Sequence, residues 1–306
     1  MSKTRKAKCS PATKKQMGTC YSRSSTSALA SAWNQLYPKN PVKGDVIEFL
    51  QREMAQCRDK DERCFSVNLL TPEEHKKAMK IDFAPDRPSE WDKNPTTWLT
   101  SDEIIEFCKQ FELLYPMKFL GPSPRDYFFK LKSTGSCYWP ELCQFNLGEY
   151  MKKGRTMFCV SFNIDKHNSD GSHWVSVFVN AANPIVEVYY FDSAGDGILP
   201  DIKRFTDMVA KQARALEKDV HYDDNEKYDH QQGDTECGMY SLFFFATMLE
   251  HSVQHAARGL EDVLMAKVMN GGGETFFANR FKNEHALIDD STMQEYRHLY
   301  FNAKYE

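Results

Sequence analysis

The sequence predicts an α+β fold in which a central, mostly antiparallel sheet is flanked by helices. Three runs rich in β-branched and aromatic residues follow one another with only short turn segments between them. Helical patterns with one apolar face lie before and after these runs. A chain of 306 residues with 41% apolar residues is also long enough to bury the core that such a sheet requires.

The N-terminal part of the chain differs in composition from the rest. Residues 1–25 are basic and rich in Ser and Thr, which predicts a flexible tail. Residues 25–57 carry two short helical patterns separated by YPKNPVKG, whose prolines cannot lie inside a helix. A proline-rich connection at residues 82–97 marks the natural boundary. We expect three parts, namely the tail at 1–25, a small helical accessory region with its linker at 26–95, and a main domain at 96–306.

The main domain is predicted to begin with a helix in WLTSDEIIEFCKQFELLY, residues 98–115, which Thr100 or Ser101 can cap. The runs TMFCVSFNI, HWVSVFVN and IVEVYYF predict three strands that form a meander at the centre of the sheet. Further along the chain, the pattern predicts a helix over 200–218, a short strand over 219–222 and a long buried helix after Cys237.

Composition narrows the functional classes. The net charge of −4 gives no global argument for nucleic acid, but the first fifteen residues form a local basic arm without an acid. Such an arm allows a contact with nucleic acid or an acidic partner, or simple solvation. No apolar run is long enough to cross a bilayer, and no secretory signal is apparent, so we expect no membrane association and a cytosolic, nuclear or virion protein. The basic residues of the arm are Lys3, Arg5, Lys6, Lys8, Lys14 and Lys15.

The nine cysteines are scattered without CxxC spacing in a chain too large to need disulfide stapling. We therefore expect most of them to be reduced, buried thiols and expect no metal site. Three pairs of cysteines are close enough in sequence for a disulfide to be considered, namely Cys9 with Cys20, Cys57 with Cys64, and Cys137 with Cys143.

Cys237 is the candidate nucleophile. It lies at the junction between the polar segment HQQGDTE and the apolar run GMYSLFFF, where a buried helix is predicted to begin. Unpaired backbone N–H groups and the helix dipole favour negative charge there, and the thiolate is the form that attacks a carbonyl. Gly238 behind it allows close approach of backbone or substrate.

A nucleophile needs a base, and the base needs a group that orients it. His173 opens one predicted strand and Asp192 ends the next, so a hairpin of the two strands places the carboxylate beside the imidazole. Gln231 or Gln232, shortly before the thiol, can donate to the oxyanion together with the Cys237 backbone N–H.

Other histidines compete for the role of base. His167 and His230 lie close in sequence to the same motifs, although His230 is too near Cys237 on one loop to be oriented well. His251 and His255 have the spacing of two zinc ligands on a helix, but the glutamate of a metalloprotease motif is missing, which favours a polar helix end. The segment NGGGE, residues 270–274, is interpreted as a loop rather than a self-cleavage site.

Three motifs, GSHWVSVFV, YYFDSAG and HQQGDTECGMYSLFF, resemble the core of the cysteine proteases that process ubiquitin-like proteins such as SUMO, and of their adenovirus-type relatives. The similarity covers roughly residues 96–302, and the motif forms are most similar to the versions found in large DNA viruses. The resemblance implies the family's α+β fold, with the nucleophile at the start of a buried helix. It assigns four catalytic residues in the family's order, His173, Asp192, Gln231 and Cys237.

The resemblance also implies a substrate. WLTSDEIIEF is similar to the family's tryptophan-bearing element, so Trp98 and Trp174 are expected to clamp a Gly-Gly tail. One residue more than usual separates Trp98 from Asp102, and the family role of Asp102 is therefore not carried over. The predicted activity is a cysteine endopeptidase without a cofactor that cleaves viral structural or core polyproteins after Gly-Gly-type sites, in the host cytoplasm or the virion. The alternatives are a SUMO-type isopeptidase, a related acetyltransferase and an inactive binder of ubiquitin-like tails.

Overall fold

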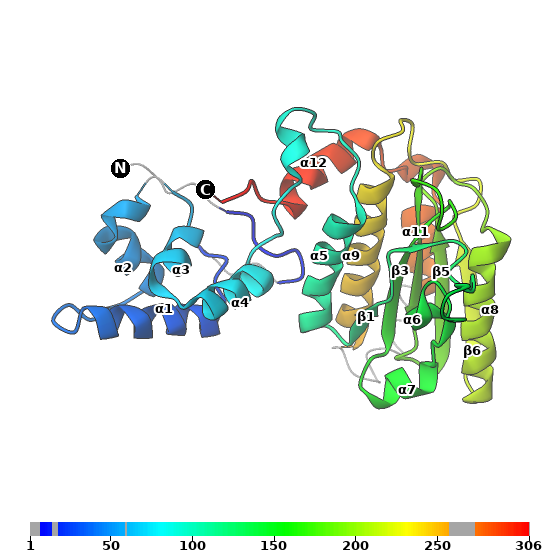
Figure 1. Ribbon diagram of the computed structural model, residues 1–306, viewed down its shortest axis with the longest axis horizontal. Helices are drawn as coiled ribbons and strands as arrows, with labels where there is room; N and C mark the ends of the chain where they lie inside the picture. The colour runs from blue at the N-terminus through cyan, green and yellow to red at the C-terminus, as the bar shows by residue number, and fades with distance from the viewer. Residues whose placement is uncertain (1–6, 14–17, 59, 257–272, 306) are drawn as a thin grey trace. The chain divides into compact units, whose positions relative to one another are not determined.

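The chain forms two compact units in the computed structural model (Figure 1). The first unit comprises Met1–Asp92 together with Arg297–Glu306, and the second comprises Lys93–Tyr296. The boundary at Asp92 lies inside the proline-rich connection expected from the sequence. The last ten residues group with the first unit, although the sequence placed them in the main domain. The structure describes residues 7–13, 18–58, 60–256 and 273–305.

The first unit is helical. The segment YPKNPVKG separates two helices as predicted, because Tyr37 ends the first and the Asp45 side chain caps the second by accepting from the Glu48 N–H. The elements of this unit are α1 (Arg23–Leu36), α2 (Val46–Glu53), the 3₁₀ turns Ala55–Cys57 and Ser89–Asp92, α3 (Arg63–Leu69) and α4 (Pro72–Asp82).

The N-terminal segment is more ordered than the sequence predicted. Residues 1–6 and 14–17 lie outside the described residues, but the rest of the expected flexible tail is packed into the first unit. Tyr21 is fully buried, its ring meets the Phe83 ring edge-on at 4.9 Å, and its hydroxyl donates to the Glu62 carbonyl at 2.7 Å. The prediction of a flexible tail is therefore wrong for the described residues, because burial of this tyrosine fixes the chain around it.

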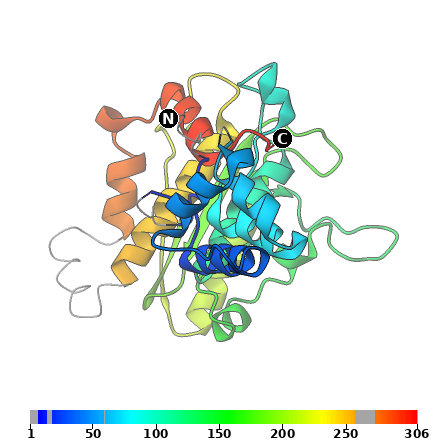
Figure 2. The same ribbon diagram turned by 90° about the vertical axis from the view of Figure 1, so that its left-hand side faces the viewer.

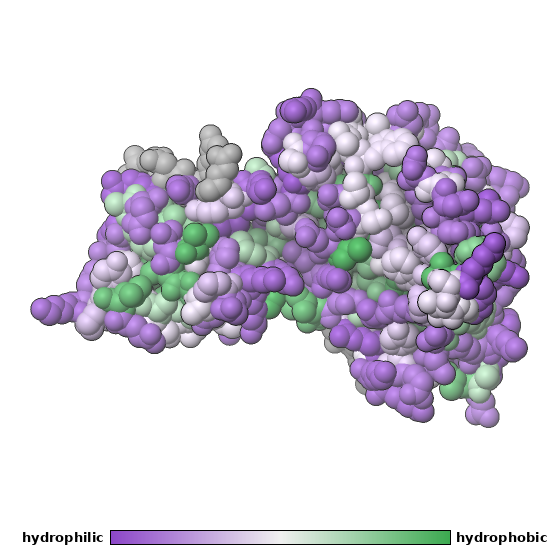
Figure 3. Space-filling model, viewed as in Figure 1, coloured by the Kyte–Doolittle hydropathy of each residue, from purple (hydrophilic) through white to green (hydrophobic). Residues whose placement is uncertain are grey.

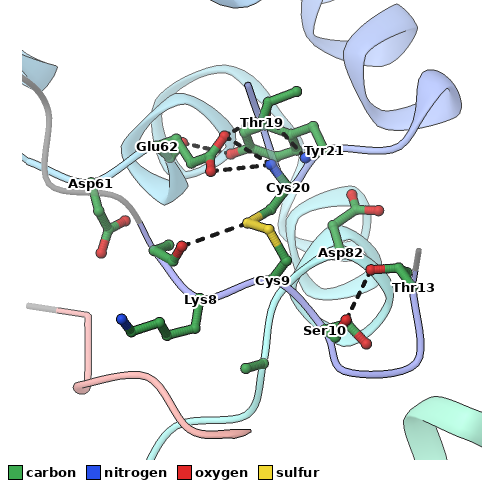
Figure 4. The surroundings of a disulfide bond; sticks show 12 residues. Lys8, Cys9, Ser10, Thr13, Thr19, Cys20, Tyr21, Asp61, Glu62 and Asp82 are labelled. Atoms are coloured by element: carbon green, nitrogen blue, oxygen red, sulfur yellow. Dashed lines mark hydrogen bonds between the residues drawn. A yellow bond between two sulfur atoms is a disulfide. The ribbon is translucent and has the colours of Figure 1, made fainter. Parts of the chain in front are cut away.

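The prediction of mostly reduced cysteines is also wrong. Three disulfides join Cys9 to Cys20, Cys57 to Cys64 and Cys137 to Cys143, the three pairs that were possible on paper. Figure 4 shows the first of them, with the Glu62 carboxylate accepting from the Cys20 N–H. The fold brings Cys9 and Cys20 to a Cα separation of 4.9 Å, which suits a disulfide, and chain length alone does not reveal this. Three cysteines are free thiols, namely Cys108, Cys159 and Cys237.

A mixed sheet lies at the centre of the second unit, with strand order β1-β3-β4-β5-β6 and with β2 also paired to β3. Its central strands β3, β4 and β5 are antiparallel, which confirms the predicted meander. The outer strands β1, β2 and β6 pair in parallel. A parallel β5–β6 pair requires a crossover, which helix α8 provides. The strands are β1 (Met117–Phe119), β2 (Ser123–Pro124), β3 (Met157–Asn163), β4 (Trp174–Asn180), β5 (Ile185–Phe191) and β6 (Asp219–Asp224).

Helices cover both faces of this sheet, with α8 on one side and α5 and α9 on the other (Figure 1). Helix α11 lies beside α9 (Figure 2). On the α8 face, alternate strand residues such as Val160 pack with Phe205, whereas on the α9 face Phe178 and Phe191 pack against Phe244. The helices are α5 (Ser101–Leu114), α6 (Pro140–Cys143), α7 (Leu147–Lys152), α8 (Pro200–Ala215), α9 (Cys237–Ala256), α11 (Gly273–Phe281), the 3₁₀ turn Glu284–Ala286 and α12 (Asp290–Tyr300).

The structure settles which residue caps α5. Thr100 is the N-cap, and its backbone N–H donates at 2.7 Å to the Glu103 carboxylate, which completes a capping box. This helix start follows directly on Trp98 and Leu99, and the Leu99 side chain lies against Gly238. On the face shown in Figure 3 hydrophilic residues predominate, and apolar areas are small and separated.

Candidate active site

Cys237 is the first residue of α9, as the sequence predicted. Its thiol is free and its side chain is buried. The first turns of α9, residues 237–245, are buried, and the helix is held between the sheet and neighbouring helices, so its first residue has a fixed position. The thiol therefore lies where the positive end of a long, rigid helix stabilises a thiolate.

His173 and Asp192 come together at one end of the β4–β5 hairpin. His173 directly precedes β4 and Asp192 directly follows β5, and the antiparallel register pairs Ser176 with Phe191. The Nε2 atom of His173 and the Oδ1 atom of Asp192 are 2.6 Å apart, a short, charge-assisted hydrogen bond. The predicted proximity of these two side chains is thus present in the structure.

Cys237 and Asp192 both act on the protonation of His173. Burial of the imidazole lowers its pKa, but hydrogen bonds to Asp192 and Cys237 and the charges of these two groups outweigh burial and raise the pKa to about 10. Since Nε2 faces Asp192, Nδ1 is the ring nitrogen left for the thiol. The raised pKa favours the charged form of the ring, which carries a proton on each nitrogen.

Asn225 anchors the backbone of Asp192. This fully buried side chain at the end of β6 accepts from the Asp192 N–H at 2.8 Å and donates to the Asp192 carbonyl at 2.7 Å. The Ala194 N–H donates to Oδ1 of Asp192 at 2.9 Å and thereby fixes the carboxylate itself. Sequence reasoning missed Asn225, because its 33-residue separation from Asp192 gives no local signal.

The structure distinguishes the two candidate oxyanion donors. Gln231 is buried, and its amide accepts from the Ser193 hydroxyl at 2.7 Å and donates to the Gly233 carbonyl at 2.8 Å. The side chain of Gln232 is exposed. Only Gln231 therefore has its amide held in one orientation, with one N–H still available for a ligand.

Asp290, at the start of α12, holds the loop that leads to Cys237. Its carboxylate accepts from the Gln232 N–H at 3.2 Å and from the Gly233 N–H at 2.7 Å. The other carboxylate oxygen lies 3.0 Å from the Tyr240 hydroxyl, one turn after Cys237 on α9. This one residue thus joins the loop before the thiol to the helix after it, and the sequence analysis did not single it out.

The two candidate clamp tryptophans lie on neighbouring segments. Trp98 is 43% exposed, a large fraction for this residue type, while Trp174 is partly buried. The Trp174 indole donates to the Leu99 carbonyl at 3.2 Å, which ties the start of β4 to the segment before α5. Leu99 in turn packs against Gly238, where an added Cβ would lie 2.9 Å from the leucine Cβ. A larger residue at position 238 would therefore clash with Leu99.

The competing histidines have other partners. Both ring nitrogens of His230 are engaged inside the protein: Nδ1 accepts from the Ile288 N–H and Nε2 faces the Phe281 carbonyl. Burial lowers the pKa of His230, so the ring is neutral and structural. The Nδ1 atom of His167 lies 2.7 Å from the Asp126 carboxylate, and its ring stacks on Phe129. These partners, and not Cys237, engage the His167 ring.

The remaining sequence hypotheses are tested in part. His251 stacks on Phe276, whereas the side chain of His255 and residues 270–272 of NGGGE lie outside the described residues. Among the described residues, no cluster of His, Cys, Asp or Glu has the arrangement of a metal site. No helix in the described part of the chain is long and apolar enough to span a membrane. Most of the basic arm also lies outside the described residues.

Residues 155–271 match the family described as the Ulp1 protease family, C-terminal catalytic domain. This segment of the chain is similar to a Ulp1-type catalytic domain. The matched segment contains His173, Asp192, Gln231 and Cys237, and it begins just before β3, so it covers the meander and the start of α9. The predicted resemblance to the proteases of ubiquitin-like proteins is confirmed.

Viral proteins are among the relatives of this chain. A protein of Acanthamoeba polyphaga mimivirus named as a thiol protease is 31% identical over 163 residues, 53% of this chain and 51% of the relative. Two proteins of African swine fever virus, one named a cysteine protease and one a SUMO-1 cysteine protease, are 27% and 28% identical over 165 residues, 52% of this chain and 60% of each relative. The chain thus spans between half and three fifths of the relatives it matches, and the predicted enzyme class is the one their names carry.

The fold of this chain has a counterpart among solved structures. The crystal structure of an African swine fever virus protease matches 99% of this chain and 98% of its own, with a TM-score of 0.58 at 18% identity. At 18% identity the similarity shows the fold alone, and it confirms the predicted α+β class.

Proposed function

We propose that this protein is a cysteine endopeptidase in which Cys237, His173 and Asp192 form the catalytic triad. The observation that carries the proposal is a partly buried imidazole that lies 2.6 Å from the Asp192 carboxylate and whose pKa is raised by both Asp192 and the free thiol at the start of a long helix. Nucleophile, base and orienting group therefore come from three elements that the fold holds rigidly. The similarity to a Ulp1-type catalytic domain supports the same assignment.

In this mechanism His173 takes the proton of the Cys237 thiol, and the resulting thiolate sulfur attacks the carbonyl carbon of the scissile bond. Gln231 and the Cys237 backbone N–H donate to the resulting oxyanion. The protonated His173 then delivers its proton to the leaving amine as the C–N bond breaks and a thioester forms. Water, deprotonated by the same imidazole, hydrolyses the thioester and regenerates the thiol.

The proposed cleavage site follows a Gly-Gly pair. Trp174 is fixed to the backbone beside Leu99, and Trp98 is exposed next to it, so the two indoles can cover a flat substrate tail. A side chain on that tail would clash with aromatic planes on either side, which favours glycine. Because the relatives are viral proteases by name, we propose viral structural or core polyproteins as the substrates, in the host cytoplasm or the virion.

A second candidate is an isopeptidase that removes SUMO or a related modifier. The name SUMO-1 cysteine protease carried by an African swine fever virus relative favours it. The chemistry at Cys237 is the same for both functions, and they differ in whether the bond cut lies within a polyprotein or joins a modifier to a lysine.

One experiment separates these functions. Wild type and Cys237→Ala are incubated with a Gly-Gly-X peptide, a SUMO fusion, a SUMO–lysine conjugate and labelled acetyl-CoA. We expect Cys237-dependent cleavage of the peptide, with less or none of the conjugate. Preferential cleavage of the conjugate would favour the isopeptidase, labelled product would indicate an acetyltransferase, and cleavage that survives in Cys237→Ala would refute the nucleophile.

We also propose that the basic arm contacts nucleic acid. Deleting residues 1–25 is not a clean test, because Cys9, Cys20 and Tyr21 belong to the packed first unit. Replacing the basic residues of the arm that lie outside the described residues with Gln removes their charge and leaves Cys9, Cys20 and Tyr21 in place. The affinity for DNA or RNA should then fall with a weaker salt dependence, and unchanged binding would refute the role. The residues to replace are Lys3, Arg5, Lys6, Lys14 and Lys15.

A further inference from the structure

We propose that Ser193 is a positioning residue that aims the Gln231 amide at the oxyanion, so that the dipeptide Asp192-Ser193 orients both His173 and the oxyanion donor. This inference rests on the proposed protease function and extends it to a residue that lies in the YYFDSAG motif but to which the motif assigns no role. It is carried by the contacts of one buried serine.

Ser193 makes three hydrogen bonds to the segment that carries Gln231. Its hydroxyl donates to Oε1 of Gln231 at 2.7 Å. Its carbonyl accepts from the N–H groups of His230 and Gln231 at 2.8 and 2.9 Å. Ser193 is 1% exposed, so these bonds form in a site with little competition from water. Backbone and side chain of Gln231 are therefore both attached to the residue after Asp192.

The hydroxyl decides which way the Gln231 amide points. In the observed orientation, the Gln231 amide oxygen Oε1 accepts from the Ser193 hydroxyl, and the amide nitrogen Nε2 donates to the Gly233 carbonyl. A flipped amide would place its oxygen against the Gly233 carbonyl oxygen, which is repulsive. One of the two Nε2 protons is then occupied by Gly233, and in the proposed mechanism the other is the one that the oxyanion accepts.

Close backbone packing supports the same connection. Gly195 has a φ of +70°, and an added Cβ would lie 2.9 Å from the Asp229 nitrogen. The Lys227 N–H donates to the Gly195 carbonyl at 2.8 Å. The loop after β5 and the loop before Cys237 are thus held together at several points, and a shift of one displaces the other. These contacts hold His173 and Gln231 in a fixed position relative to each other.

The test compares Ser193→Ala with Ser176→Ala in the full-length protein, with cleavage of a Gly-Gly-X peptide as the assay. Ser176 is a matched control, since its side chain is fully buried in β4 and its hydroxyl has no hydrogen-bond partner among the described residues. Loss of one buried hydrogen bond predicts that Ser193→Ala lowers kcat about 5- to 30-fold with KM nearly unchanged, less than the about 10²-fold or greater loss expected for the donor itself. Ser176→Ala should leave kcat unchanged.

A double-mutant cycle separates positioning from a general structural effect. If Ser193 acts through Gln231, Ser193→Ala should have little further effect on kcat in a Gln231→Ala background. An equal loss of kcat in both backgrounds, or a loss confined to KM, would overturn the proposal. If the alanine variant does not fold, as judged by its Tm, Ser193→Cys replaces it, because it keeps the size of the side chain and a weak donor, and the same cycle applies.

The outcomes also distinguish this inference from the proposed function. Cys237-dependent cleavage by wild type together with an unchanged Ser193→Ala protein overturns the role of Ser193 alone. No Cys237-dependent cleavage by wild type overturns the protease function, and the role of Ser193 with it.

Discussion

Replacing Asp192 with Asn should separate the charge of the triad from its geometry. Oδ1 of Asp192 accepts both from His173 Nε2 and from the Ala194 N–H. An Asn side chain can keep its single oxygen in that place and retain both contacts, while Asn225 continues to hold the backbone. The substitution thus removes the negative charge and leaves the imidazole nearly in place.

The size of the effect follows from the protonation of His173. The rise of its pKa from 6.5 to about 10 is a preference for the charged ring on the order of 5 kcal/mol, net of burial, and Asp192 and Cys237 share it. A charge-assisted hydrogen bond contributes about 1.5–3 kcal/mol, so the pKa of His173 should fall by about one to two in Asp192→Asn. Because the lowered pKa still lies above 7, kcat/KM near neutral pH should change little for this reason, and the fall of about 10- to 100-fold should appear at alkaline pH, where the variant loses the His173 proton first.

The raised pKa of His173 also determines how the free energy of unfolding changes with pH. A raised pKa in the folded state stabilises the fold fully below pH 6.5, and this contribution is lost as pH rises toward about 10. The unfolding free energy of wild type should therefore decline over that range more steeply than that of Asp192→Asn.

NMR titration of ¹⁵N-labelled histidine, urea unfolding at a series of pH values and pH profiles of kcat/KM measure these quantities. A control, His230→Gln, removes a structural histidine and should leave the His173 titration unchanged. An Asp192→Asn protein in which His173 titrates as in wild type would refute the reasoning.

Three further predictions concern the support of the site. Asp290→Ala should lower the unfolding free energy by about 1–2 kcal/mol and speed amide exchange of Gly233, which hydrogen-exchange mass spectrometry can measure; unchanged exchange would contradict the loop-holding role. Gly238→Ala should cost about 1–3 kcal/mol through contact with Leu99, and Leu99→Ala should relieve part of that cost, so purely additive changes in Tm would argue against the contact. Breaking the Cys57–Cys64 disulfide with a Cys57→Ser, Cys64→Ser double variant should cost about 2–3 kcal/mol, and free thiols at these positions in non-reducing peptide mapping would show that the bond does not form.

The sequence could predict the parts of the site that lie next to strong local patterns. His173 and Asp192 adjoin two strands whose short connection makes a hairpin the expected arrangement, and antiparallel pairing alone then brings their ends together. Cys237 stands where a polar segment changes to a long apolar run, which locates a helix start. In each case the relevant geometry is set within one or two neighbouring elements.

The residues that support the site could not be found in this way. Ser193 and Gln231 are 38 residues apart, and Asp290 and Gln232 are 58 apart, so only the complete fold brings them together. Ser, Asn and Asp are also common in turns, and nothing in their local sequence distinguishes a turn residue from one that holds a distant loop. The disulfides were missed for a related reason, because Cα separations depend on the fold.

The position of the last residues of the chain has a consequence for synthesis. Asn302 donates to the carbonyls of Lys8 and Ala84, and its own carbonyl accepts from the Arg87 N–H, so it belongs to the first unit. A ribosome makes the whole of Lys93–Tyr296 before this segment emerges. The Cys9–Cys20 bond links residues only 11 apart and can form long before that. The part of the protein that is translated first is therefore the part that completes its folding last.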